Sequence, residues 1–238
     1  MSLAGKTVLI TGGSSGMGFA SAQALAAAGA SVWIASRSEK RLQDAAARLG
    51  KGTRTSTLDV TCESEVKAFF EKCDPFDHLV TCAAGTAMGF FAFSETAPVR
   101  DYFESKFWGQ YLTARYGSQK IRPGGSITLF SGAANKKATA MMTPSAAING
   151  AIEGLARTLA QELAPIRVNV VSPGLIDTEL HAGMPADQKA GLFAMVAQSL
   201  PIKRVGLPED AARAVLFLIE CEYATGSVVS VDGGYSAI

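Results

Sequence analysis

The chain has 238 residues, the size of a single α/β domain, and 48% of them are hydrophobic, which excludes an intrinsically disordered protein. The formal net charge of +1, with no stripe of Lys or Arg, gives no electrostatic case for binding nucleic acid or an anionic membrane. Four scattered cysteines and two histidines lack metal-ligand spacing, so we expect no metal site. The apolar runs are too short for a membrane span and no signal peptide stands out, so we expect a cytoplasmic protein.

Short apolar runs rich in β-branched residues alternate with helical patterns along the whole chain. The predicted strands are residues 7–10, 31–35, 55–60, 78–82, 126–130, 167–171 and 227–231. The predicted helices are residues 18–28, 39–49, 63–73, 99–119, 145–163 and 209–221. Near-continuous apolar strands separated by helices are typical of a parallel sheet covered on both faces. We therefore predict one α/β domain over residues 1–238, a Rossmann-type doubly wound sheet of about seven strands.

A glycine-rich turn lies between the first predicted strand and the first predicted helix. Gly12, Gly16 and Gly18 would allow a tight turn, close approach of the backbone to a pyrophosphate, and close packing of the helix. The N-terminus of that helix would offer free N–H groups to the phosphates. This position in the chain favours a dinucleotide site over a purely structural turn.

The residues at the end of the second predicted strand bear on the choice of cofactor. An acid there would bind the ribose 2′-hydroxyl of NAD and repel the 2′-phosphate of NADP. This chain has Ser36, Arg37 and Ser38 instead. Arg37 can pair with the phosphate or stack on adenine, and Ser14 and Ser38 can donate hydrogen bonds to it. NADP(H) is therefore favoured over NAD(H), the alternative being that Arg37 is a solvated arginine at a helix start.

These motifs resemble the short-chain dehydrogenase/reductase family, and the resemblance runs from residue 7 to residue 234. Three residues separate the first two glycines of the turn, Asp59-Val60 resembles the family's adenine-pocket motif, and residues 172–178 resemble its nicotinamide loop. Residues 205–210 and 225–234 are similar to its C-terminal signatures. The cofactor-binding residues that the resemblance implies are Gly12, Ser14, Ser15, Gly16, Met17, Gly18, Ser36, Arg37, Ser38, Asp59, Val60, Ala83, Ala84, Gly85, Pro173, Gly174, Ile176 and Thr178.

The catalytic residues that the resemblance implies are replaced in this chain. The family reduces carbonyl groups with a Tyr that donates a proton and a Lys four residues later, and these positions fall on Pro144 and Ile148. The family's Ser falls on Gly132, with Ser131 one residue away, and its helix Asn aligns with Lys106. Ser131 and Lys106 remain the candidate catalytic residues. Lys106 would either point into the pocket, in part replacing the missing lysine, or reach into solvent.

Residues 175–201 carry Gly183, Pro185 and Gly191 and are predicted to form a substrate lid, in which His181 is a candidate acid. Aromatic and methionine residues are expected to line the pocket and favour a small, flat or apolar substrate. They are Met88, Phe90, Phe91, Phe93, Met141, Met142, Leu180, Met184, Phe193 and Met195.

Three functions remain open on these grounds. The first is an NADP(H)-dependent oxidoreductase that transfers hydride to an activated acceptor, such as a quinone or an iminium compound, which needs little acid from the protein. The second is a non-catalytic NADP(H)-binding sensor or assembly protein. The third is an elimination or isomerisation with Lys106 or His181 as base. In the family, the helices corresponding to residues 99–119 and 145–163 pair across a two-fold axis, so we expect a homodimer or homotetramer.

Overall fold

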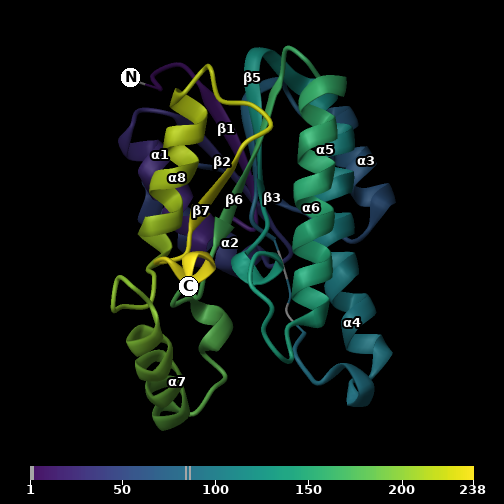
Figure 1. Ribbon diagram of the computed structural model, residues 1–238. Helices are drawn as coiled ribbons and strands as arrows, with labels where there is room; N and C mark the ends of the chain where they lie inside the picture. The colour runs from purple at the N-terminus through teal and green to yellow at the C-terminus, as the bar shows by residue number, and fades with distance from the viewer. Residues whose placement is uncertain (1–2, 84, 86) are drawn as a thin grey trace.

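The computed structural model describes residues 3–83, 85 and 87–238, and seven parallel strands in it form one sheet (Figure 1). In chain order the strands are β1 (Thr7–Thr11), β2 (Ser31–Ser36), β3 (Arg54–Thr57), β4 (Phe76–Thr81), β5 (Ile121–Phe130), β6 (Arg167–Pro173) and β7 (Val228–Val231). Their order across the sheet is β3-β2-β1-β4-β5-β6-β7. The direction of winding reverses between β1 and β4, which confirms the predicted doubly wound α/β fold.

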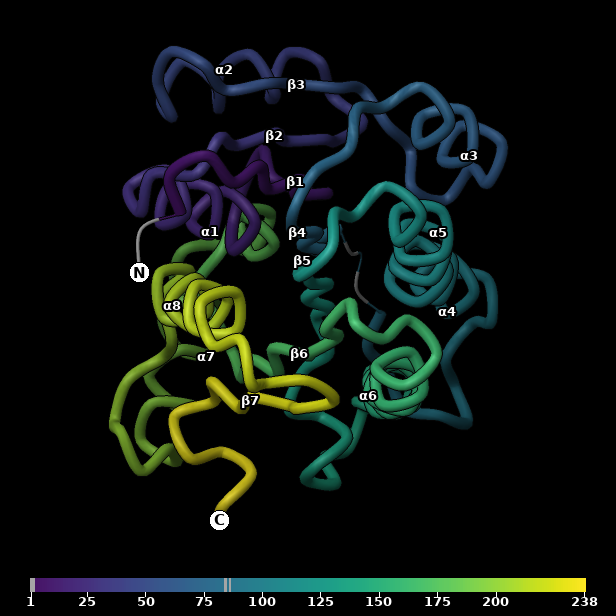
Figure 2. The backbone as a smooth tube through the Cα atoms, turned by 90° about the horizontal axis from the view of Figure 1, so that it is seen from above, coloured from purple at the N-terminus to yellow at the C-terminus, as the bar shows by residue number. Residues whose placement is uncertain are grey.

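Helices cover both faces of the sheet (Figure 2). One face carries α1 (Gly16–Ala27), α2 (Glu39–Leu49) and α8 (Pro208–Glu220), and the other carries α3 (Glu63–Lys72), α5 (Gly109–Gly117) and α6 (Thr143–Glu162). Alternate strand residues feed the two buried clusters: Leu9 and Leu79 pack toward α3, α5 and α6, whereas Ile10 and Val80 pack toward α1 and α8. None of the described helices is long and apolar enough to cross a bilayer.

Two helices extend beyond the carboxyl ends of the strands, one on each side (Figure 1). Helix α4 (Thr96–Phe103) continues through a π-helical turn (Glu104–Trp108) into α5, where the sequence predicted one regular helix over residues 99–119. Helix α7 (Ala186–Ser199) lies inside the predicted lid and was not predicted as a helix. It has no buried residue and a glycine in its middle, so it lacks the apolar periodicity that reveals a packed helix.

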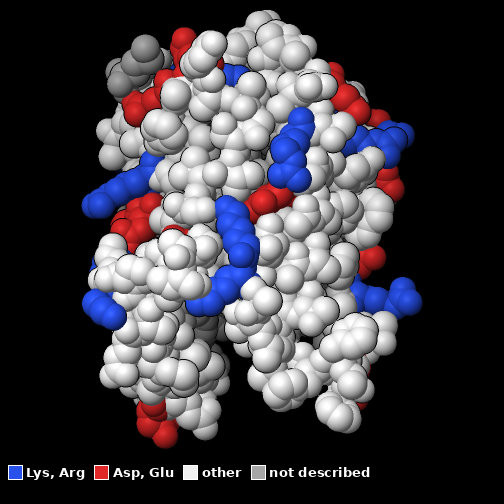
Figure 3. All heavy atoms as spheres, in the orientation of Figure 1, with Lys and Arg blue, Asp and Glu red and all other residues white. Residues whose placement is uncertain are grey.

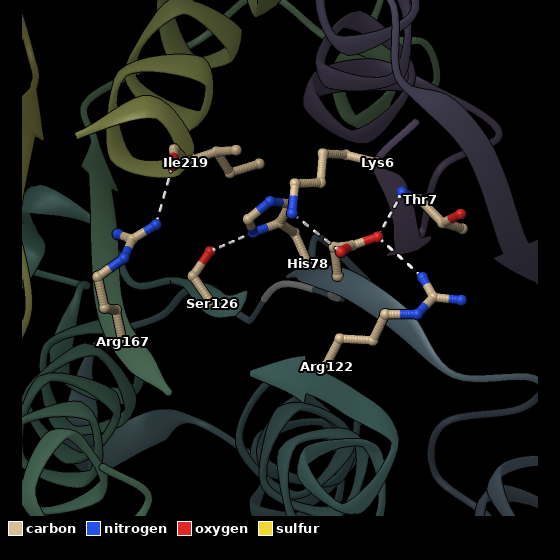
Figure 4. A network of polar contacts seen from close by, with 8 residues as sticks. Lys6, Thr7, His78, Arg122, Ser126, Arg167 and Ile219 are labelled. Carbon is tan, nitrogen blue, oxygen red and sulfur yellow. Dashed lines mark hydrogen bonds and ion pairs between the residues drawn. The ribbon is translucent and has the colours of Figure 1, made fainter. Parts of the chain in front are cut away.

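Polar interactions within the chain close the opposite end of the sheet, where the strands begin (Figure 4). The carboxylate of Asp77 in β4 accepts hydrogen bonds from the Thr7 N–H at 2.8 Å and from Arg122 at 2.9 Å. The next residue, His78, pairs its Nδ1 with the Ser126 hydroxyl at 2.9 Å and is buried. Because these groups satisfy one another's hydrogen bonds, we expect a ligand site at the other end of the sheet, where the strands end.

Candidate active site

The glycine-rich turn lies at the switch point between β1 and β4, and its shape requires glycine. Gly12 has a φ of +73°, and a Cβ on it would lie 2.5 Å from the backbone N of Ala83. A Cβ on Gly18 would lie 2.3 Å from the Gly12 carbonyl oxygen. Helix α1 starts beside this turn, and the side chain of its N-cap residue, Ser15, makes no capping hydrogen bond. The N-terminus of α1 therefore presents N–H groups without a side-chain cap, which suits a pyrophosphate.

The end of β2 offers polar groups that suit a phosphorylated ribose. The Ser36 hydroxyl is buried and has no hydrogen-bond partner within the part of the chain that the structure describes. Arg37 beside it is exposed. Ser38 caps α2, since its Oγ accepts from the Arg41 N–H at 3.4 Å, and its own hydroxyl proton remains available to a ligand. The Ser36 hydroxyl is unpaired among the described residues, the Arg37 guanidinium is exposed, and none of the residues 36–38 is acidic. This combination fits a 2′-phosphate.

The predicted cofactor-binding residues that are described all lie at the carboxyl ends of parallel strands, at one edge of the sheet. After β3, Asp59 fixes a turn by accepting hydrogen bonds from the N–H and the hydroxyl of Thr61, at 3.0 and 2.8 Å. After β6, a Cβ on Gly174 would lie 2.9 Å from the Asp232 Cα, so the nicotinamide-type loop packs tightly on the segment after β7. Ala84 falls outside the described residues.

The first part of the predicted lid folds back over the glycine-rich turn. A Cβ built on Gly16 would lie 3.4 Å from the Glu179 carboxylate and 3.5 Å from the Thr178 side chain. A carboxylate therefore lies close to the N-terminus of α1, where a phosphate would bind. His181 packs edge-on against Phe193 of α7, with ring centroids 5.4 Å apart. The lid histidine is thus held by the lid helix.

Helix α6 carries Pro144 and Ile148, the two positions at which the sequence analysis placed the family's Tyr and Lys. Pro144 lies in the first turn of the helix, where a missing N–H costs nothing, and Ile148 is fully buried in the core. Ser145 and Asn149, also four residues apart, are the residues that lie toward the site. A Cβ on Gly132 would lie 2.9 Å from the Asn149 Nδ2, and the Asn149 Oδ1 is buried without a hydrogen-bond partner among the described residues. Neither position holds Tyr or Lys.

The structure brings Ser131 and Lys106 together, but through the main chain of Ser131. The Lys106 Nζ donates to the Ser131 carbonyl oxygen at 2.9 Å, so the lysine points inward. The Ser131 hydroxyl turns away and donates to Glu153 of α6 at 3.1 Å. Burial lowers the pKa of the Lys106 ammonium to about 8. Lys106 is therefore a cation that can lose its proton near neutral pH, whereas the Ser131 hydroxyl is already committed to a carboxylate.

Tyr102 belongs to this group of side chains, and sequence analysis missed it. Its hydroxyl lies 3.4 Å from the Lys106 Nζ and 3.4 Å from the Ser145 Oγ. Burial raises the pKa of the Tyr102 phenol, an effect that the hydrogen bond between Tyr102 and Ser145 opposes in part. Tyr102 and Lys106 stand four residues apart in one predicted helix, the same spacing that was sought and not found in α6. That spacing was the signal that could have found the pair.

The space-filling view shows a cleft between the two projections of the molecule, below the carboxyl ends of the strands (Figure 3). The segments on both sides of the cleft carry exposed apolar side chains. Phe93, before α4, is 88% exposed, and Met195, in α7, is 65% exposed. Met142, Met184 and Phe193, from the same predicted lining, are partly buried. An entrance with this composition suits an apolar ligand.

Comparison with known proteins places this site in a family. A family model described as Enoyl-(Acyl carrier protein) reductase matches residues 12–236. Carbonyl reductase family member 4 of Danio rerio is 31% identical, over 96% of this chain and 97% of its own. A solved small-chain dehydrogenase in complex with NADPH is 35% identical with a TM-score of 0.83, over 98% of this chain and 99% of its own. A solved short chain dehydrogenase/reductase family protein is 32% identical with a TM-score of 0.90, and each chain is covered in full. This chain therefore belongs to the short-chain dehydrogenase/reductase family of oxidoreductases.

Proposed function

We propose that this protein is an NADP(H)-dependent oxidoreductase with an atypical active site, and that it transfers hydride between the cofactor and an activated acceptor such as a quinone or an iminium compound. The observation that carries the proposal is the contrast between two parts of one site. The turn at Gly12 and Gly18 has the shape that a dinucleotide needs, while Ser145 and Asn149, the α6 residues that in this proposal take the places of the family's Tyr and Lys, can supply neither a phenol nor an ammonium.

The choice of NADP(H) rests on Arg37 and on the unpaired hydroxyl of Ser36 beside it. A guanidinium can bind the 2′-phosphate through charge-assisted hydrogen bonds, and Ser36–Ser38 contains no acid to repel it. The solved NADPH complex that resembles this chain supports the same choice.

The choice of an activated acceptor rests on helix α6. A serine hydroxyl is a much weaker acid than a phenol beside a lysine, so Ser145 alone would polarise a plain ketone poorly. A quinone or an iminium carbon accepts hydride more readily and depends less on an acid in the site. The apolar side chains around the cleft favour a flat or apolar acceptor of this kind.

A non-catalytic NADP(H) sensor is the second candidate, and Glu179 favours it. Its carboxylate lies at the glycine-rich turn and would have to move, or be repelled, when a pyrophosphate binds. Cofactor binding would then displace the lid segment after β6, as a sensor requires.

One experiment separates these candidates. The purified protein is mixed with NADPH and, in parallel, a naphthoquinone, an N-methyl dihydroisoquinolinium salt or acetophenone, and oxidation of NADPH is followed by its absorbance. The proposal expects turnover of one or both activated acceptors and little turnover of the ketone. Tight NADPH binding without turnover of any acceptor would favour the sensor, and equal turnover of ketone and quinone would contradict the choice of acceptor.

We also propose that the protein associates through α5. A groove beside this helix is lined by Thr61, Glu63, Glu104, Trp108, Tyr111, Leu112 and Arg115, and Trp108 is 42% exposed in it. An exposed aromatic cluster rimmed by charges is typical of an interface. Sedimentation velocity of the Trp108→Arg variant tests the proposal: it expects a smaller species than the parent protein, and an unchanged mass would refute this interface.

A further inference from the structure

A chain of polar contacts runs from the end of β5 to the start of α6. It begins at the Ser131 carbonyl oxygen, passes through the Lys106 Nζ at 2.9 Å and the Tyr102 hydroxyl at 3.4 Å, and ends 3.4 Å further on at the Ser145 Oγ. Tyr102 is 5% exposed and Ser145 is 7% exposed, so water competes little for these contacts. The last member of these contacts, Ser145, is the α6 residue that the proposed function puts in the place of the family's Tyr.

The backbone around Lys106 is built to hold this arrangement. Lys106 lies in the π-helical turn, and such turns are rare and are frequently found at functional sites. The Gln110 side chain donates to the Lys106 carbonyl oxygen at 2.8 Å and to the Phe130 carbonyl oxygen at 2.9 Å, and it accepts from the Phe130 N–H at 2.8 Å. The buried Gln110 amide therefore connects the turn that carries Lys106 to the last residue of β5, just before Ser131.

The charges around Lys106 leave its ammonium without a partner of opposite sign. Within the described ranges Lys106 forms no ion pair. Its polar neighbours are the Tyr102 phenol of α4 and the backbone carbonyl of Ser131, just after β5. The Tyr102 phenol in turn contacts the Ser145 hydroxyl of α6. The Glu153 carboxylate accepts a hydrogen bond from the Ser131 hydroxyl and lies 4.0 Å from the Lys136 Nζ. Among the described residues, the partners of the Lys106 ammonium are thus neutral oxygen atoms and not a carboxylate.

We propose that Lys106, Tyr102 and Ser145 form a proton relay that delivers a proton to the oxygen of the acceptor, so that the acceptor carries a carbonyl oxygen, as a quinone does, and is not an iminium cation. This inference rests on the proposed oxidoreductase function and narrows its substrate class. Ser145 contacts the acceptor, and Tyr102 and Lys106 act through Ser145.

During reduction the acceptor gains a hydride from the cofactor and a proton from the relay. The bound nicotinamide cofactor supplies the hydride. As hydride reaches the acceptor, the Ser145 O–H bond breaks and its proton bonds to the acceptor oxygen. Ser145 takes the proton of the Tyr102 hydroxyl, and Tyr102 takes a proton from the Lys106 ammonium. Lys106 is left as a neutral amine and takes a proton from water. One hydride and one proton are added, which converts a quinone to a hydroquinone.

The titration of the two outer groups suits this sequence. With a pKa of about 8, the Lys106 ammonium can donate and recover a proton near neutral pH. Burial raises the pKa of Tyr102, so the phenol stays neutral and passes a proton on without storing a charge. An iminium acceptor takes no proton on reduction, and the ammonium of Lys106 would repel its positive charge.

The test compares the pH dependence of kcat for the naphthoquinone in the parent protein and in three variants, Ser145→Ala, Tyr102→Phe and Lys106→Arg. In the parent, kcat should fall as the pH rises through about 8, where Lys106 loses its proton. Each variant should lower kcat by about 100-fold with little change in KM or in NADPH affinity. Lys106→Arg should also abolish the fall with pH, because a guanidinium keeps its proton. Reduction of the dihydroisoquinolinium salt should change little.

Matched controls and a second readout keep the test decisive. Lys120 also donates to a backbone carbonyl, that of Glu71 at 3.2 Å, and Tyr116 donates to Glu63, both away from the cleft. Lys120→Met and Tyr116→Phe should leave the pH profile unchanged. Without cofactor, NMR titration of isotopically methylated lysines should show one lysine near pH 8 whose midpoint moves in Tyr102→Phe.

An unchanged kcat and pH profile in Tyr102→Phe and Lys106→Arg would overturn the relay while leaving the oxidoreductase function in place. A parent protein that reduces only the iminium salt would do the same. If NADPH binds and no acceptor is reduced, both the relay and the proposed function are overturned.

Discussion

Protonation of His78 should cost this protein a measurable share of its stability, at a pH above that at which Asp77, Asp210 and Asp232 lose their contributions. His78 is 5% exposed in β4, and burial, aided by the positive charges of Arg167 and Lys6 and opposed by Asp77, lowers its pKa from 6.5 to about 4 (Figure 4). The unfolded chain therefore binds a proton near pH 6.5, and the folded chain binds it only near pH 4. Between these values the unfolded state holds more protons, so stability is lost as the pH falls.

The size of the effect follows from the shift. A difference of 2.5 pKa units between 6.5 and about 4, at 1.36 kcal/mol per unit, corresponds to about 3 kcal/mol of unfolding free energy. The contribution is fully present above pH 6.5 and is lost as the pH falls toward 4. Asp77, Asp210 and Asp232 have pKa values below 3.8, so their contributions are lost at lower pH.

Urea unfolding at fixed protein concentration, from about pH 8 down to about pH 4.5, measures this loss. In His78→Asn the amide can still pair with the Ser126 hydroxyl but has no proton to take up, so the decline over this range should flatten by about 2–3 kcal/mol. His181→Asn, at the other histidine, should retain the decline of the parent protein. Equal pH dependence in the parent and in His78→Asn would refute the reasoning.

Three further predictions concern the cofactor site, each measured by NADPH titration. In Gly18→Ala the added Cβ would lie 2.3 Å from the Gly12 carbonyl oxygen, so the turn must shift at a cost of roughly 1–3 kcal/mol, with weaker binding and a lower Tm. Gly150→Ala, with open space around it on α6, is the control, and an equal effect there would contradict the steric argument. Arg37→Ala should weaken NADPH binding about tenfold and leave NADH binding unchanged, whereas parallel losses would remove Arg37 from the choice of cofactor. Glu179→Gln should tighten NADPH binding a few-fold at low salt and less at high salt, and weaker binding would show that the carboxylate assists the cofactor.

The strands and the glycine-rich turn could be predicted because their signals are local. A strand covered on both faces is mostly apolar, and a turn with the shape of Gly12 requires glycine, so both leave a recognisable pattern in the sequence. The predicted strand over residues 55–60 was too long, since β3 ends at Thr57. Asp59 lies beyond the last strand residue and bonds to its own turn.

The catalytic end resisted prediction for geometric reasons. Around an α-helix each residue turns by about 100°, so a shift of one residue along α6 exchanges Ile148, which packs in the core, for Asn149, which lies against Gly132. Because this helix is rich in alanine and glycine, its sequence indicates only weakly which of its sides faces the core. Tyr102 and Ser145 are 43 residues apart in sequence, and only the packing of α4 against α6 brings their hydroxyls together.

The close approach of Gly132 to Asn149 ties two replacements in the site to each other. A side chain at position 132 would meet the Asn149 amide 2.9 Å from its Cβ, and Asn149 is 2% exposed with little room to move. Replacing Gly132 by serine alone would therefore disturb Asn149, so the effects of substitutions at these two positions should not be additive. The same coupling means that engineering a conventional active site into this chain requires exchanging these positions together.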